Sequence, residues 1–335
     1  MPDERITEPA VARPTLSSNT AVDVALLRDP SDSMAATADL FRSPAFFRLH
    51  AGSFSRAWYA VAMDAGSARV ISTAWFAEYE SGHARSGARG PYGGFAESAS
   101  GLPISVAARV LTTTESELRS RGISRVSITL PPAAHDRDVH AEWMNVYLRA
   151  GYRSTIADLN YHVQVTETDL SARMNSGNRA VVRTASRKGL FARALQASER
   201  AEAYAVNAQN RARRGRRMTM SLDALLQMDD ALPDTVCWFG VFAGERMIAA
   251  SVCLRVSPRI VYVFYLGEAD GAERQSPVTI LVSHIHDWCR DHGVALLDLG
   301  IATEAGVPNE GLMAYKRNLG FEVSPKYTLE KELVP

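Results

Sequence analysis

The sequence predicts a mixed α/β protein that contains one structural unit twice. The chain has 335 residues, of which 46% are hydrophobic and 22% are charged, so it is long enough and apolar enough for two globular domains. The stretches that begin at Pro103 and Pro277 run through the same order of helices, strands and glycines. Near-equal offsets of 171 residues, from Gly122 to Gly293, and 169 residues, from Gly151 to Gly320, favour an internal repeat.

Each copy begins with alternating strands. Apolar and polar residues alternate, and turn residues separate the runs, as in antiparallel hairpins. The expected strands are 57–63 and 69–76 in the first copy, and 236–243, 247–256 and 260–266 in the second.

A long amphipathic helix follows in each copy. Each helix starts at a proline, whose missing N–H costs nothing in the first turn, and ends at Gly122 or Gly293. A short strand comes next, then a second helix that ends at a glycine followed by an aromatic residue, and then a final strand that closes the unit. We therefore expect a flexible tail over 1–32, a first domain over 33–165 and a second domain, with the catalytic site, over 166–335.

The net charge of zero hides an uneven distribution. The chain has 37 basic and 37 acidic residues, but the 45 residues from Arg173 to Arg217 contain twelve Lys and Arg and two Glu. A chain that is basic over its whole surface is excluded, whereas one local face is predicted to attract an anionic partner.

Three features predict a cytoplasmic protein without a metal. The three cysteines have no C-x-x-C spacing, which favours free thiols in a reducing compartment. The longest apolar run, 260–266, is too short to span a membrane, and the N-terminus lacks the apolar core of a secretory signal. His284 and His286 are two residues apart on a predicted helix, so they face different directions and do not form a metal pair.

Four segments resemble a known family when they are taken in order. They are GPYGGF (90–95), NRAVVRTASRKGL (178–190), LLDLG (296–300) and AYKRNLGF (314–321). This set is similar to the FemABX family, which comprises aminoacyl-tRNA-dependent transferases built from two tandem GNAT-like domains. The resemblance implies two GNAT-like domains with mixed sheets over about residues 35–333. A lysine that family members carry in the first domain has no clear counterpart here, which favours a specialised metabolite over a cell-wall precursor as acceptor.

The resemblance also implies a catalytic group in the second copy. Lys316 and Tyr315 match the family's aromatic–lysine pair, and Asp298 matches an acid at a strand end. A cation at Lys316 suits a tetrahedral oxyanion, although a solvated helix-end lysine has the same sequence signature. Asp298 suits an amine-binding group or a base, or alternatively a carboxylate that caps a loop. The first copy has Tyr147 where the second has Lys316, so we expect the chemistry in the second copy.

Two donors remain open, with no other cofactor expected. The basic segment suits aminoacyl-tRNA, because arginine binds backbone phosphates well. Acyl-CoA would need a Gly-rich loop before the long helix, but Pro277 stands where its first glycine should be and removes a backbone donor. The residues expected to bind either donor are Arg179, Arg183, Lys188, Arg211, Arg214, Arg274 and Ser276.

The leading prediction is amide formation between an amino acid from aminoacyl-tRNA and an amine of a small molecule or peptide. The expected acceptor cleft contains Arg42, Tyr92 and Tyr265, although aromatic residues on strands are more often part of a core. The alternatives are an acyl-CoA-dependent N-acyltransferase that acts on a sugar or metabolite amine, and a tandem domain that only binds RNA. A monomer is expected in each case.

Overall fold

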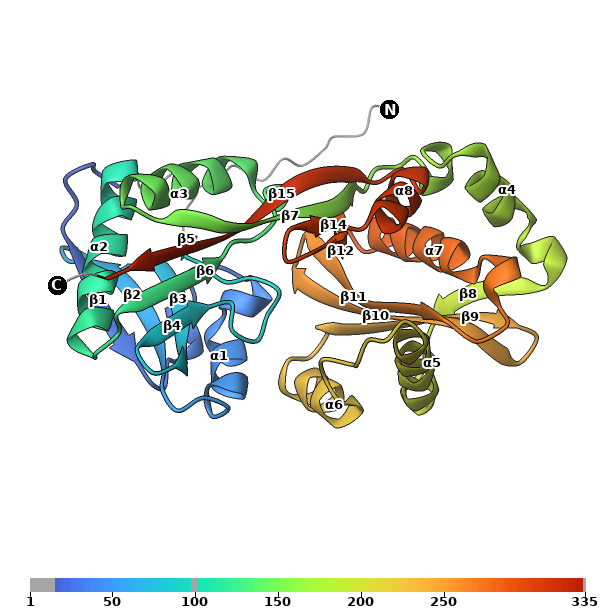
Figure 1. Cartoon of the computed structure of the whole chain (residues 1–335), viewed down its shortest axis with the longest axis horizontal. Coiled ribbons are helices and arrows are strands. Elements are labelled where there is room, and N and C mark those ends of the chain that lie inside the picture. Colours follow the sequence, from blue (N-terminus) through green and yellow to red (C-terminus); the bar gives the residue numbers. More distant parts are fainter. Residues whose placement is uncertain (1–15, 98–101, 334–335) are drawn as a thin grey trace, which may run out of the picture.

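The computed structural model describes residues 16–97 and 102–333 as two lobes joined by two long strands (Figure 1). The first lobe is α/β, as its alternating strands and amphipathic helices predict. Its elements are β1 (Val22–Leu27), α1 (Pro44–Ala51), β2 (Ala57–Asp64), β3 (Val70–Glu80), β4 (His83–Ser86), β5 (Ala96–Glu97), α2 (Ile104–Ser120), β6 (Arg125–Thr129), α3 (Arg137–Arg149) and β7 (Arg153–Gln164).

The second lobe repeats this order and adds helices before its first hairpin. Its elements are α4 (Ser176–Thr184), β8 (Leu190–Ala194), α5 (Arg200–Arg213), α6 (Leu222–Ala231), β9 (Val236–Ala243), β10 (Arg246–Ser257), β11 (Ile260–Glu268), α7 (Pro277–Asp291), β12 (Leu296–Ile301), β13 (Thr303–Glu304), β14 (Val307–Pro308), α8 (Glu310–Asn318) and β15 (Glu322–Glu332). The expected strands and long helices of both copies are confirmed.

The helix ends follow from glycine. The four glycines after α2, α3, α7 and α8 all have positive φ, between +68° and +92°, which lets the chain reverse after each helix. At Gly320 a side chain is excluded as well, because a Cβ there would lie 2.5 Å from Cβ of Arg173. The repeat is therefore visible in backbone geometry.

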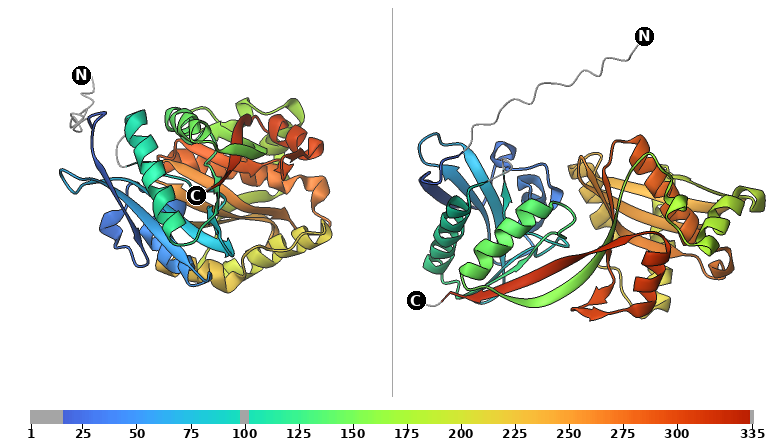
Figure 2. Two further views of the ribbon diagram at one scale, coloured as in Figure 1. Left: turned by 60° about the vertical axis from the view of Figure 1, so that its left-hand side comes forward. Right: turned by 90° about the horizontal axis from the view of Figure 1, so that it is seen from above.

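One continuous sheet runs through both lobes. Among the described residues it has thirteen strands, in the order β1-β2-β3-β4-β6-β15-β7-β12-β11-β10-β9-β8, with β5 paired to β3. Strand β15 pairs with β6 of the first lobe, and β7 pairs with β12 of the second (Figure 2). The two copies thus exchange their final strands, and the expectation that each final strand closes its own unit is wrong.

The apolar cores show the same exchange. Leu329 of β15 is fully buried in a core of the first lobe, whereas Tyr161 and Val163 of β7 are fully buried in a core that fills the second lobe and continues into α1, β2 and β3 of the first. Antiparallel pairing over Glu322–Glu330 with His162–Arg153 joins the two strands to each other. Strand pairing therefore crosses the expected boundary at 165/166 in both directions.

The expected tail over 1–32 needs correction. Residues 22–27 form β1, which pairs with β2 from Val22↔Asp64 to Leu27↔Tyr59. Val22, Val24 and Leu26 alternate with less apolar neighbours and pack against the first core, which is the period of a half-buried strand. Residues 1–15 lie outside the described ranges.

The three cysteines are free, and burial raises the pKa of each thiol. Cys253 and Cys289 are buried in the second core. No helix in residues 16–97 and 102–333 is both long and apolar enough to cross a lipid bilayer.

Candidate active site

Two parallel strands diverge in the middle of the second lobe. Strands β11 and β12 are paired only from Ile260↔Leu296 to Tyr262↔Asp298. Beyond Asp298 the register of β12 against β7 shifts, and Gly300 has a φ of +73°. This irregular end leaves backbone carbonyls of β12 free to accept hydrogen bonds from side chains.

Lys316 fills this irregular end. Its Nζ donates to the carbonyl oxygens of Leu299 at 2.8 Å, Gly300 at 2.8 Å and Ile301 at 2.9 Å. The residue is 4% exposed, and Nζ lies 5.5 Å from the ring centre of Tyr161. Burial lowers the pKa of Lys316 to about 7, although the nearby carboxylate of Asp298 acts in the opposite direction. Lys316 is thus a buried cation whose three N–H groups are all used, not a solvated helix-end lysine.

Asp298 is the last paired residue before β12 becomes irregular. Its Oδ2 accepts from His135 Nε2 at 2.7 Å, and its Oδ1 accepts from Asn160 Nδ2 at 2.8 Å and from the Gly300 N–H at 2.7 Å. Burial raises the pKa of the Asp298 carboxyl, but the hydrogen bonds from His135, Gly300 and Asn160 and the electrostatic interaction with His135 outweigh it, so the pKa is lowered. The carboxylate is fully satisfied and joins side chains from both halves of the chain.

The neighbouring aromatic positions differ between the copies. Tyr315 packs against the second core, and burial raises the pKa of its phenol to about 12. Tyr147, which takes the place of Lys316 in the first copy, is fully buried. It also lines a cavity between the two lobes. The equivalent positions in α3 and α8 therefore have different surroundings. Tyr147 of α3 lines the cavity, whereas Lys316 of α8 is bonded to the end of β12.

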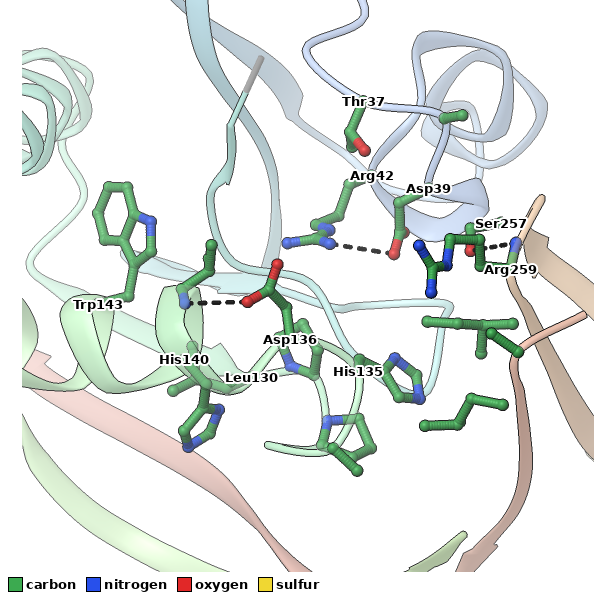
Figure 3. Close-up of a pocket in the computed structure, with 18 of the residues that line it drawn as sticks. Thr37, Asp39, Arg42, Leu130, His135, Asp136, His140, Trp143, Ser257 and Arg259 are labelled. Carbon is green, nitrogen blue, oxygen red and sulfur yellow. Dashed lines mark hydrogen bonds and ion pairs between the residues drawn. The ribbon is translucent and has the colours of Figure 1, made fainter. Parts of the chain in front are cut away.

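That cavity has a volume of about 540 Å³. It lies where the first lobe meets the start of β11 and β12, and Figure 3 shows polar side chains around it. Arg42 lines it, as expected for the acceptor cleft, and donates to Asp39 Oδ2 at 3.1 Å and to the Phe95 carbonyl at 2.9 Å. Other lining residues are Thr37, Asp39, Leu130, His135, Asp136, His140, Trp143, Ser257 and Arg259.

The other two residues expected in the acceptor cleft do not line this cavity. Tyr92 is 1% exposed and donates to Asp39 Oδ2 at 2.9 Å, so it supports the wall that Arg42 belongs to. Tyr265 is 3% exposed, and its hydroxyl receives the N–H groups of Thr219 and Met220 at 3.0 and 2.9 Å. Both are held as core residues with satisfied hydroxyls.

Much of the basic segment is neutralised within the protein. Six of its twelve cations form ion pairs with carboxylates, which are Arg173, Arg193, Arg200, Arg213, Arg214 and Arg216. Arg179 donates to the carbonyls of Ser171 and Met174, and Arg211 donates to the carbonyl of Arg217. Of the residues expected to bind donor, Arg179, Arg211 and Arg214 therefore already have structural partners.

Three exposed cations remain at the end of α4. Arg183, Arg187 and Lys188 are exposed, and none of them is paired with an acid of the described residues. Helix α4 is anchored to the helix that carries Lys316, because the Asn318 carbonyl accepts from the Asn175 N–H at 3.0 Å and from Asn178 Nδ2 at 3.1 Å. We call Arg183, Arg187 and Lys188 the α4 cation cluster.

The start of α7 is built around proline. Arg274 is exposed, and Ser276 has a φ of +48° directly before Pro277, the first residue of the helix. The proline supplies no N–H for a bound phosphate, and the side chain of Ser276 does not cap the helix. In the first copy, residues 98–101 of the corresponding loop lie outside the described ranges.

The most informative residue missed by sequence reasoning is His135. It follows β6 in the loop PPAAHD, and nothing in its spacing indicates that it meets Asp298, which is 163 residues away. Asn160, on the exchanged strand β7, is hidden for the same reason. Only the exchange of strands brings these partners together.

Comparison with known proteins agrees with this architecture. Residues 169–317 match the acetyltransferase (GNAT) domain. No curated protein matches the chain. Among solved structures, FemX is similar with a TM-score of 0.66 and 11% identity, over 88% of this chain and 92% of that chain. L-PGS from Bacillus licheniformis is similar with a TM-score of 0.55 and 14% identity, over 77% and 80% of the two chains. A tandem GNAT protein from the clavulanic acid biosynthesis pathway has a TM-score of 0.54 and 10% identity, over 94% and 99%.

The fold consists of two tandem GNAT-like units, as in these solved structures, and residues 169–317 match the acetyltransferase (GNAT) domain. The arrangement of the two units is similar to that of FemX, as expected from the sequence, and the domain match falls in the second copy.

Proposed function

We propose that the protein transfers an aminoacyl group from aminoacyl-tRNA to an amine and forms an amide. The amine acceptor occupies the cavity of about 540 Å³ between the first lobe and the start of β11 and β12, and the acyl ester is bound at the irregular end of β12. The observation that carries the proposal is the network at the end of β12, where Lys316 is bonded to three backbone carbonyls and Asp298 is bonded to His135 of the cavity wall.

The residues suit a reaction that depends mainly on position and charge. An unprotonated amine attacks the ester carbonyl, a C–N bond forms, and the tRNA 3′-oxygen leaves with a proton. Lys316 stabilises the developing oxyanion by its positive charge, because its N–H groups already serve the carbonyls of β12. By holding those carbonyls it also keeps the diverging strand in one conformation.

The α4 cation cluster is the proposed contact for the anionic donor. It is exposed, unpaired within the described residues, and fixed to α8 through Asn318. Arg274 and the remaining exposed cations of 211–217 would extend this contact. FemABX resemblance supplies the identity of the donor, and the same resemblance supports reaction in the cytoplasm. One chain holds both proposed sites, so we expect a monomer to be active.

The test is discharge of charged tRNA. Purified protein is incubated with tRNA charged with radiolabelled amino acids and with aliphatic diamines, amino sugars or amino acids as acceptors. We expect label to move into an amide that resists mild base, which hydrolyses the ester. Failure of every charged tRNA to be discharged faster than in buffer would exclude the proposal. Salt-sensitive tRNA binding without any discharge would favour the RNA-binding alternative.

A second candidate is an acyl-CoA-dependent N-acyltransferase. The match of residues 169–317 to the acetyltransferase (GNAT) domain favours it, whereas Pro277 at the start of α7 counts against a phosphate site there. Calorimetry with CoA distinguishes the two donors. Tight binding of CoA together with turnover of an acyl-CoA would replace tRNA as donor.

A further inference from the structure

We propose that His135, held by Asp298, is the general base that takes a proton from the attacking amine. The inference rests on the proposed acylation of an amine, and it applies to either acyl donor. It assigns a role to a first-lobe residue in a reaction otherwise assigned to the second lobe.

The orientation of the imidazole is determined by the carboxylate. Asp298 Oδ2 lies 2.7 Å from His135 Nε2, and the two side chains are 1% and 5% exposed. Oδ1 of Asp298 is occupied by Asn160 and Gly300, so the carboxylate cannot rotate away without losing these donors. A carboxylate accepts only, so Nε2 carries a hydrogen, and in the neutral imidazole Nδ1 then has the lone pair.

The second ring nitrogen of His135 is the proposed base. Nδ1 of His135 has no hydrogen-bond partner among the described residues, although the ring is buried. The residue lines the main cavity, together with Arg42 and Arg259, and Figure 3 shows its ring at the cavity wall below Asp39 and Arg259. A buried, unpartnered acceptor beside a cavity is costly unless a ligand supplies the missing donor.

The ring is also held by its other neighbours. Tyr92 contacts it edge to face, with ring centres 5.3 Å apart, and Tyr92 itself is fixed by Asp39. The titratable or charged groups around this pair are Asp298 from β12, His162 from β7, Lys316 from α8, Lys326 from β15, and Tyr92, Asp39 and Asp136 from the first lobe. Burial lowers the pKa of His162, which favours the neutral form of that neighbouring ring. Asp298 is the carboxylate bonded to His135, and it would stabilise an imidazolium there.

The proton balance is complete. As the amine nitrogen forms its bond to the acyl carbon, Nδ1 accepts one proton from that nitrogen, and Asp298 stabilises the resulting imidazolium. When the C–O bond of the ester breaks, the proton passes to the leaving oxygen. The products are the amide and the free hydroxyl of the donor, and His135 returns to its neutral form; with acyl-CoA the C–S bond breaks instead and the proton passes to the leaving thiolate, which gives free CoA.

The first test separates base catalysis from a structural link between lobes. In His135→Gln the amide keeps a donor toward Asp298 but has no basic nitrogen. We expect kcat/KM to fall by about 10²- to 10⁴-fold, with little change in the unfolding midpoint. In His135→Ala, added imidazole should restore part of the activity. His292→Gln, at the exposed end of α7, is the matched control and should keep full activity.

Two results would overturn the inference. One is a His135→Gln enzyme that stays within about threefold of the wild type, with the same acid limb in its pH profile. The other is independent of turnover: ¹⁵N NMR of the wild-type imidazole should show a protonated Nε2 and an unprotonated Nδ1 at pH 7.5. A ring protonated on both nitrogens at that pH would exclude a base, whether or not the wild type transfers any acyl group. Inactivity of the wild type alone would count against the proposed function instead.

Discussion

At the scale of single residues, the most unusual feature is a buried lysine whose ammonium group is bonded to backbone carbonyls and forms no ion pair within the described residues. Lys316 gives its three N–H groups to the carbonyls of Leu299, Gly300 and Ile301. Burying an ammonium costs several kcal/mol, which the carbonyl dipoles offset only in part. A positive charge at this buried position agrees with the proposed role of Lys316 beside the acyl ester.

The first prediction concerns Lys316→Met. We expect activity to be lost, because the charge that faces the oxyanion is gone. Three buried carbonyls also lose their donor, so the free energy of unfolding should fall by about 2–4 kcal/mol in urea titrations. Arg317→Met removes the same charge from the exposed face of α8 and should change neither quantity. Equal effects of the two variants would contradict a specific role for Lys316.

The second prediction concerns pH. The pKa of Lys316 is lowered to about 7 from 10.5, so the ammonium form is lost as the pH rises through about 7. We expect kcat/KM to decline above that pH.

Stability should move in the opposite direction. Between pH 7 and 10.5 the unfolded chain binds this proton and the folded chain does not, so the free energy of unfolding rises with pH. Lys316→Met, compared across pH by denaturant midpoints, should lack this dependence. A wild type whose stability falls over the same window would refute it.

At the scale of elements, α4 and the turn that follows it contain two kinds of cation, one bonded within the protein and the others exposed at the surface. Arg179 of this helix is tied to backbone carbonyls at 3.1 and 2.9 Å, whereas the α4 cation cluster is exposed. The helix is also bonded to the end of α8. A donor bound to this cluster would therefore be positioned relative to Lys316 through two connected helices.

The third prediction tests the α4 cation cluster. Replacing Arg183, Arg187 and Lys188 by Ala should weaken tRNA binding and reduce the slope of log affinity against log salt by about 2–3, since each lost phosphate contact removes roughly 0.7–0.9. Filter binding between 50 and 200 mM salt measures both. The control replaces Arg119, Arg149 and Arg153 of the first lobe, which are exposed but far along the chain from the second copy. An unchanged slope in the α4 variant would place the donor elsewhere.

At the scale of the whole molecule, the exchanged strands decide how the lobes depend on each other. Strand β15 supplies Leu329 to the first core, and β7 supplies Tyr161 and Val163 to the second. Neither core is complete without residues from the other half of the chain. The two lobes should consequently unfold together.

The fourth prediction is a shared transition. Leu329→Ala creates a cavity in the first core and should lower the free energy of unfolding by about 2–5 kcal/mol. Fluorescence from Trp58 and Trp143, which lie in the first core, reports the first lobe, and fluorescence from Trp238 and Trp288 reports the second, once the other tryptophans are changed to Phe. We expect both reporters to shift together. Val323→Ala, at a position on β15 that is 46% exposed, is the control. Displacement of the first-lobe midpoint alone would show that the lobes unfold independently.

Much of the local structure was predictable because it depends on neighbouring residues. The strands 236–243 and 260–266, the helix that begins at Pro277 and the four glycine-ended helices all follow from short-range patterns. Strand β1 was not predicted because the Pro, Ser and Thr residues before it are typical of loops, although Val22, Val24 and Leu26 alternate as in a strand. The charge excess of 173–217 was visible too, but its ion pairs with distant acids were not.

The sequence by itself determined the repeated α/β unit, its order of elements and the difference between Tyr147 and Lys316. Tertiary structure alone decided which copy each final strand joins, because the backbone of a strand can form hydrogen bonds with an edge of either sheet. It also decided that His135 meets Asp298 and that a cavity forms beside them. Contacts between residues 163 positions apart leave no periodic signal in the chain, since they depend on how two folded units pack and not on the spacing of residues within either one.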